Sequence, residues 1–214
     1  MRRVFIWLGW LPAVVVILWM GHSLAQITIS DIDRSRFMEV KRAAGHALIP
    51  FWHVLIATHV VSAVGALALG LLTFRWAKRS RWDRHRLAGK GYAVCVVISA
   101  LSSVPLIISV TGGWPTMLAF GLLYVLWFTT TGLTILRIKQ HNVAAHRRWA
   151  ARSYAVTLAN LSLHLLWPTL ILVTGEDVHS YTLSVALSGP LNLAVVEGWW
   201  RWQARRLKTT PPAR

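Results

Sequence analysis

Residues 49–90 read IPFWHVLIATHVVSAVGALALGLLTFRWAKRSRWDRHRLAGK, and this stretch decides the class of the protein. The first part, 49–74, is almost wholly apolar, and about 20 such residues are enough for a helix to cross the hydrocarbon core of a bilayer. The second part, 75–90, carries seven basic residues. A long apolar helix followed by a basic loop is typical of a membrane protein whose loop faces the cytoplasm.

The composition of the whole chain agrees with this interpretation. Of the 214 residues, 55% are hydrophobic and only 14% are charged, with a mean hydropathy of +0.50. Soluble domains carry about a quarter charged residues, so this chain is too apolar to cover a water-facing surface. Apolar stretches that approach or exceed spanning length occupy residues 4–20, 49–74, 89–110, 114–138, 149–173 and 181–200. None of them alternates with the period of a strand. We therefore expect an all-α membrane protein, a six-helix transmembrane bundle.

The basic residues predict the topology of this bundle. Nineteen of the 23 lysines and arginines lie before the first stretch, between the second and third, between the fourth and fifth, and after the sixth. The remaining loops hold four basic and five acidic residues. Under the positive-inside rule both termini are cytoplasmic. The net charge of +16 then reflects orientation and attraction to anionic lipid headgroups, and a nucleic-acid partner loses its support.

We divide the chain into a first transmembrane helix with an outer loop (1–48), a five-helix transmembrane core (49–200) and a basic cytoplasmic tail (201–214). The first stretch also resembles a secretory signal, because small residues at Ser23 and Ala25 offer a cleavage site. Its length and three tryptophans favour an uncleaved helix. A single cysteine, Cys95, excludes a disulfide-linked scaffold.

Two of the predicted helices begin with similar basic sequences, HRLAGKGY at 85–92 and HRRWAARSY at 146–154. Each has a His-Arg pair followed by a tyrosine, but the His-to-Tyr spacing differs by one residue, so the spacing gives little support to an internal duplication. The positive-inside rule accounts for the arginines and not for the histidines. These helix starts are either orientation signals alone or sites for an anion such as a phosphate, a lipid headgroup or a propionate.

These motifs, together with His59 and the small-residue helix that follows it, resemble the bacterial membrane-protein family called domain of unknown function 2306. The resemblance covers residues 50–200 and implies a multi-pass protein of the bacterial cytoplasmic membrane with no established activity. One position departs from the pattern, because similar proteins are expected to carry an arginine where this chain has His164. The residues that match the family pattern are His59, His85, Gly89, Tyr92, His146, Arg147, Trp149, Arg152, Tyr154, Asn192 and Glu197.

Ionisable residues inside a span are functional-site candidates, because an unpaired charge is costly there. Counted along their helices, His59 and His164 lie about 15 Å and about 14 Å from the same membrane face. His59 is followed by a stripe of small residues, which lets helices pack closely. Polar residues recur at helical spacing on the same spans, at Ser153, Thr157, Asn160 and His164 and at Tyr92, Ser99 and Ser103. We expect these faces to meet in one polar seam.

Two histidines at one depth on neighbouring helices are the arrangement that holds a b-type haem. The leading prediction is therefore an electron-transfer protein whose haem iron is held by His59 and His164. His85 and His146 form a second candidate pair, with nearby arginines to neutralise propionates. The predicted cofactor-binding residues are His59, His164, His85, His146, Arg86, Arg147, Arg152, Tyr92 and Tyr154, and the predicted core polar residues are His53, Asn160, Asn192 and Glu197.

Two other functions remain open. A proton or small-anion carrier would use His59, His164, Asn160 and Glu197 as its path, although the sequence shows no broken helix, and Glu197 is expected to pair with Arg201 one turn on. A non-catalytic assembly subunit would bind another membrane protein or a second copy of this chain. The residues leave open whether the chain is an enzyme. A metal site among His22, His46 and His179 is the weakest interpretation, because their spacing matches no ligand signature.

Overall fold

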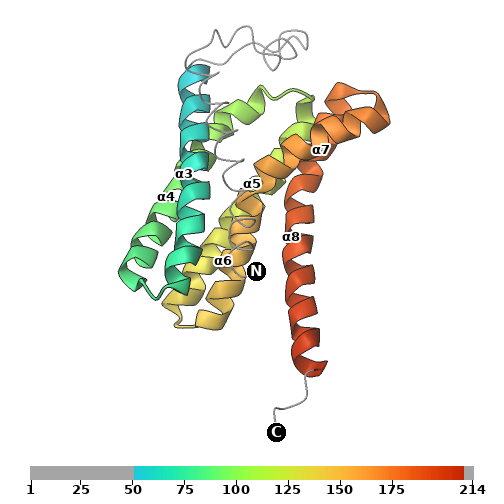
Figure 1. Cartoon of the computed structure of the whole chain (residues 1–214). Helices are drawn as coiled ribbons and strands as arrows, with labels where there is room; N and C mark the ends of the chain where they lie inside the picture. The colour runs from blue at the N-terminus through green and yellow to red at the C-terminus, as the bar shows by residue number, and fades with distance from the viewer. Residues whose placement is uncertain (1–50, 210–214) are drawn as a thin grey trace. The chain divides into compact units, whose positions relative to one another are not determined.

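The computed structural model describes residues 51–209, and all regular secondary structure in that range is helical (Figure 1). This confirms the all-α prediction for the described part of the chain. The predicted first span at 4–20 lies outside it, as do His22 and His46. The helices are α3 (Trp52–Lys78), α4 (Trp82–Ile108), α5 (Gly113–Lys139), α6 (Val143–Thr157), α7 (Ala159–Thr174) and α8 (Asp177–Thr209).

Three of these helices, α3, α4 and α5, are long and apolar enough to cross a membrane. They correspond to the second, third and fourth predicted spans. The bent pair of α6 and α7 makes a fourth candidate if the two are taken as one broken span. The count of six spans and the cytoplasmic placement of both termini stay predictions.

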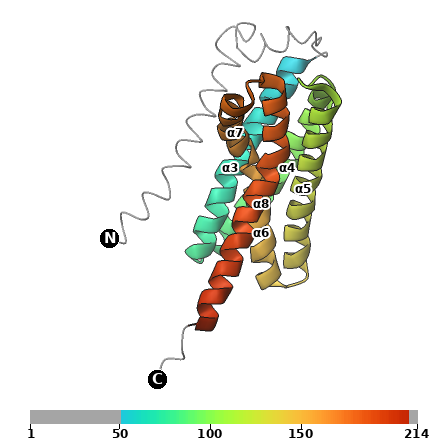
Figure 2. The same ribbon diagram turned by 90° about the vertical axis from the view of Figure 1, so that its right-hand side faces the viewer.

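The sixth predicted span corresponds to α8, the longest of the described helices, which runs past α7 and α6 (Figure 2). It is less apolar than α3, α4 and α5, because charged residues gather in its C-terminal part and serines recur every four residues at Ser180, Ser184 and Ser188. All three are fully buried, whereas Leu187 and Leu191 are exposed. The polar face of α8 therefore packs inward and its apolar face points outward, the reverse of a soluble amphipathic helix.

The described chain divides into two compact units, one ending at Met117 and the other beginning at Leu118. In the first unit, α3 and α4 form an antiparallel hairpin (Figure 1). A Cβ atom added at Gly65 would lie 2.9 Å from the Sγ atom of Cys95, so the absence of a side chain there lets the two helices approach closely.

In the second unit, α5 is followed by α6, α7 and α8, and apolar side chains from three of these helices form its core. Ala119, Leu163 and Val185 are buried together, with Phe120 and Tyr181 packed against them. The core thus joins α5, α7 and α8 within this unit.

The prediction of one continuous helix over 149–173 is wrong. The chain turns by 42° between α6, which ends at Thr157, and α7, which begins at Ala159. Pro168 does not cause this break, because it lies well inside α7. The break also divides the predicted polar stripe: Ser153 and Thr157 lie on α6, whereas Asn160 and His164 lie on α7.

Asn192 of α8 makes two hydrogen bonds at this break. Its Nδ2 atom donates a hydrogen bond to the carbonyl oxygen of Ala155 at 3.0 Å, and its Oδ1 atom accepts one from the hydroxyl of Ser162 at 2.7 Å. In a continuous α-helix the Ala155 carbonyl would accept the amide of Ala159. A side chain that occupies a backbone acceptor interrupts the helical ladder. Asn192 therefore bridges the two halves of the broken helix.

Candidate functional site

His59, in the N-terminal third of α3, links the two helices of the first hairpin. Its Nδ1 atom lies 2.8 Å from the carbonyl oxygen of Ser99 on α4 and 3.1 Å from the Ser99 hydroxyl. Ser99 is fully buried. A carbonyl oxygen only accepts, so the Nδ1 atom of His59 carries the proton, and in the neutral ring the lone pair is on Nε2.

The two histidines that open the basic motifs make the same kind of contact. The Nδ1 atom of His85 lies 3.0 Å from the carbonyl oxygen of Thr73, and that of His146 lies 2.9 Å from the carbonyl oxygen of Thr134. In both cases the partners are 12 residues apart, across the turn between two helices. These histidines therefore bind the end of the preceding helix, and they too hold the proton on Nδ1.

The two helix pairs are joined in the same way. A single offset of 61 positions relates His85 to His146 and Thr73 to Thr134. The same offset relates the turn residues Ser80 and His141, which both adopt left-handed backbone conformations, with φ of 53° and 57°. The offset aligns Tyr92 with Ser153 and not with Tyr154, and this is why the His-to-Tyr spacing concealed the repeat.

The predicted cofactor-binding residues belong to both units. His59 and His85 lie in the first unit and His146 and His164 in the second, so their pairing on one haem stays a prediction. His53, predicted as a core polar residue, is exposed, with its ring edge-on to Trp52 at a centroid distance of 5.3 Å. Of the remaining predicted residues, Tyr92 is buried, His164, Tyr154 and Asn160 are partly buried, and Arg86 and Arg147 are exposed.

Glu197 pairs with a different arginine from the one expected. Its Oε1 atom lies 2.6 Å from the Nε atom of Arg152 on α6, so the ion pair joins α6 to α8, where the sequence predicted a pair with Arg201 within one helix. The guanidinium carbon of Arg152 also lies 4.6 Å from the centre of a Trp149 ring. Arg152 is thus held between a carboxylate and an aromatic face.

A cavity of about 460 Å³ lies beside these residues at the turn between α5 and α6. Arg137 and Arg148 line it together with Arg152, and neither of them was among the residues singled out from the sequence. The signal that would have found them is their position, in the last turn of one helix and near the start of the next. The full lining consists of Arg137, Asn142, Ala144, Ala145, Arg148, Trp149 and Arg152, which we call the arginine cavity.

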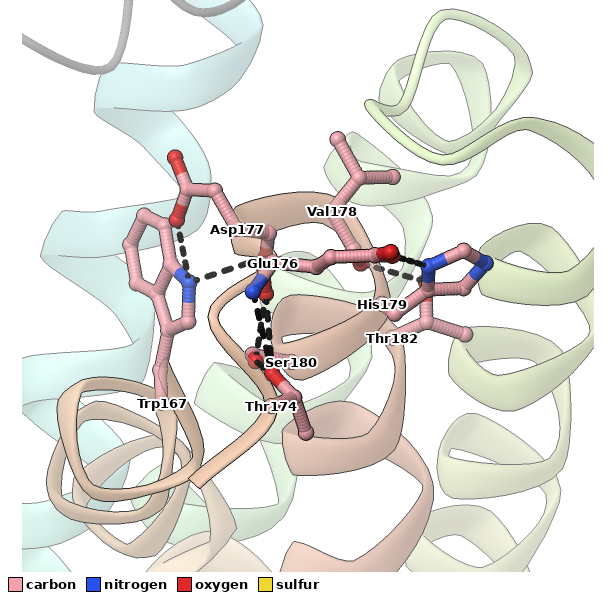
Figure 3. Close-up of polar contacts among 8 residues, drawn as sticks. All are labelled: Trp167, Thr174, Glu176, Asp177, Val178, His179, Ser180 and Thr182. Atoms are coloured by element: carbon pink, nitrogen blue, oxygen red, sulfur yellow. Dashed lines mark hydrogen bonds and ion pairs between the residues drawn. The ribbon is translucent and has the colours of Figure 1, made fainter. Parts of the chain in front are cut away.

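The turn between α7 and α8 is fixed by its own polar contacts (Figure 3). The Nε1 atom of Trp167 donates to the Oδ1 atom of Asp177 at 2.9 Å, and His179 pairs with Glu176. His179 is therefore engaged with a carboxylate close to it on the chain. Among residues 51–209, no group of three histidine, cysteine, aspartate or glutamate side chains gathers in a way that would hold a bare metal ion.

Long apolar helices, a closely packed α3–α4 hairpin and buried serines on α8 are typical of an integral membrane protein. The model of a family described as a predicted membrane protein (DUF2306) matches residues 56–200, and the chain belongs to that family. The family named from the sequence motifs is thus confirmed. No curated protein and no solved structure shows significant similarity to the chain.

Proposed function

We propose that this protein is a membrane electron-transfer protein that binds b-type haem through its histidines. The observation that carries the proposal is shared by His59, His85 and His146. Each keeps its Nδ1 atom within 3.0 Å of a backbone carbonyl oxygen on a neighbouring helix. Histidines that ligate metals through Nε2 usually make such an outer hydrogen bond, because it fixes the ring orientation and the tautomer.

The same hydrogen bond also occurs in histidines that only pin helices together, so the chemistry must be tested. A haem requires one or two protein ligands, and the lack of a three-ligand cluster among the described residues does not bear on it. Bound haem would supply one-electron chemistry. The chain would hold and orient the imidazoles and surround them with apolar helices, which exclude water.

The test is a reduced-minus-oxidised visible spectrum of the full-length protein, purified in detergent from cells supplied with haem, with a haem extraction assay. We expect a stoichiometric low-spin signal that is lost or becomes high-spin in His59→Ala, His85→Ala or His146→Ala. The matched control is His141→Asn, because His141 is exposed in the α5–α6 turn and asparagine tolerates its left-handed backbone. A featureless spectrum of folded protein would refute the proposal.

A proton or small-anion carrier is a second candidate, and the break between α6 and α7 favours it. No broken helix was expected from the sequence, and broken spans often line the binding sites of transporters. Asn192 and Ser162 place polar groups at this break. We expect proton flux into liposomes containing the protein to fall in His59→Ala and Asn192→Ala. A flux that survives both substitutions would exclude this function.

A further inference from the structure

We propose that the arginine cavity binds a phosphate group. The cavity lies wholly in the second unit, where Arg137 lies in the last turn of α5, and Arg148 and Arg152 lie four residues apart on α6. Residues four apart on a helix share a face. Three guanidinium groups from two helices therefore border one space of about 460 Å³, ample for a phosphate.

The charge of this cavity is not balanced by the residues that line it. None of the seven lining residues carries a carboxylate. Glu197 bonds to Arg152 from α8, and within the described residues the Arg148 side chain has no ion pair or hydrogen bond. Like charges held close together repel one another, so an anion between them would be bound favourably.

Arg137 gives the most direct sign of a missing acceptor. Its Nη1 atom donates to the Oε1 atom of Gln140 at 2.9 Å, but its Nε atom is buried and has no hydrogen-bond partner among the described residues. A buried charged donor without an acceptor is costly, and buried polar atoms in native proteins are nearly always paired. An anion in the cavity would supply that acceptor.

The surrounding groups favour phosphate among the anions. Arginine forks donate in pairs to phosphate oxygens, and a phosphate offers enough oxygens for three such groups. The cavity also lies at the start of α6, where Asn142 accepts the amide of Ala145 and the helix dipole presents its positive end. Trp149 holds the Arg152 guanidinium against its ring at 4.6 Å. The site uses none of the imidazole nitrogens on which the haem proposal depends, so either proposal can fail alone.

The same chemistry is carried by an anionic phospholipid headgroup and by soluble phosphate, and one experiment separates them. Native mass spectrometry of the full-length protein in detergent would measure retention of dioleoylphosphatidylglycerol, with zwitterionic dioleoylphosphatidylcholine as the comparison lipid. We expect one saturable phosphatidylglycerol. Displacement by millimolar inorganic phosphate identifies a site that takes soluble phosphate, and phosphatidylglycerol retention that resists it identifies a headgroup site.

Substitutions decide whether the cavity is the site. Arg148→Gln removes an exposed arginine whose side chain has no hydrogen bond to the described residues, and it is expected to weaken binding about tenfold, as is Arg137→Gln. Lys139→Gln removes one positive charge at the same helix end without touching the cavity, and it is expected to change binding less than about twofold. The proposal is overturned if Lys139→Gln weakens binding as much as Arg148→Gln. It is also overturned if the unmodified protein retains neither phosphatidylglycerol in preference to phosphatidylcholine nor inorganic phosphate.

Discussion

The α3–α4 and α5–α6 helix pairs begin alike and then differ. In both turns a histidine contacts a threonine carbonyl. Beyond this contact α4 is one helix of 27 residues, whereas α6 ends at Thr157. At equivalent positions, Ala66 and Val96 of the first pair are buried apolar residues, and Trp127 and Thr157 of the second share a hydrogen bond of 2.9 Å. The turn contact is therefore common to both pairs, and the residues that join the helices beyond it are apolar in the first pair and hydrogen-bonded in the second.

The largest effect on stability is expected at Asn192, whose two hydrogen bonds lie at the break that only the second pair has. Asn192→Ala removes two hydrogen bonds and leaves the Ala155 carbonyl without its side-chain donor. We expect a loss of about 2 kcal/mol in the free energy of unfolding, measured as a lower unfolding temperature in detergent. Asn160→Ala is the control, because no hydrogen bond of the Asn160 side chain is found in the described chain.

Hydrogen exchange adds a second measurement on the same variant. If Asn192 causes the break, its removal lets the Ala159 amide bond to the Ala155 carbonyl, and exchange at residues 158–162 slows relative to the rest of α7. Faster exchange at these residues would show that Asn192 only stabilises a break that another feature produces.

The two turn histidines provide the next test. His85→Ala and His146→Ala each remove one partly buried hydrogen bond to a backbone carbonyl, so each is expected to cost about 1 kcal/mol in the free energy of unfolding. The exposed neighbours Arg86 and Arg147 serve as controls when changed to alanine, with effects below about 0.5 kcal/mol. Chemical denaturation in detergent measures all four. Unequal losses at the two histidines would show that the turns are alike in geometry and different in energy.

Much of this fold could be predicted from the sequence, because spanning length and hydrophobic composition are local properties. The segments 49–74, 89–110 and 114–138 each became one helix, with ends within four residues of the expected ones except at the start of α4, which begins seven residues earlier than expected. The break near Leu158 could not be predicted, because the residue that binds there, Asn192, lies on another helix. A long-range hydrogen bond leaves no pattern in the sequence around the site of its effect.

The candidate site was predictable in part for a similar reason. His59 was predicted as a site residue because ionisable residues are rare within an apolar span, and His85 and His146 because they open the two basic motifs. Their shared contacts between Nδ1 and a backbone carbonyl depend on how the helices pack, which the sequence does not show. The arginine cavity was missed because Arg137 and Arg148 look like ordinary orientation signals until the turn brings two helix ends together.

A smaller effect, with the opposite sign, is expected at the turn residues. Ser80 and His141 both have positive φ, which costs energy in residues with a Cβ atom. Ser80→Gly and His141→Gly relieve that cost, and each is expected to stabilise the protein by roughly 0.5–1 kcal/mol. Arg79→Gly is the control, because φ at Arg79 is −99° and glycine only adds flexibility there. Stabilisation at one turn alone would contradict their equivalence.

The smallest effect concerns a link that only the second pair has. Arg152 pairs with Glu197 at 2.6 Å, whereas the equivalent position of the first pair is Gly91, where an added Cβ would lie 2.9 Å from a Leu69 methyl group. The side chains of Arg152 and Glu197 are 22% and 37% exposed, so solvent screens much of their attraction. We expect a coupling energy of about 0.5 kcal/mol from a double-mutant cycle of Arg152→Gln and Glu197→Gln.

That cycle also separates two ways in which α8 is held against α6. Because salt screens an exposed ion pair, we expect the coupling energy to be smaller still in 1 M salt. A small coupling energy would mean that α8 is held against α6 mainly by Asn192 and the buried serines. A parallel cycle of Glu197→Gln with Arg201→Gln is the control and should give a smaller coupling, because Glu197 pairs with Arg152 across the helices. An equal coupling energy with Arg201 would mean that Glu197 is stabilised by the positive charge around it in general, and that its contact with Arg152 adds no energy of its own.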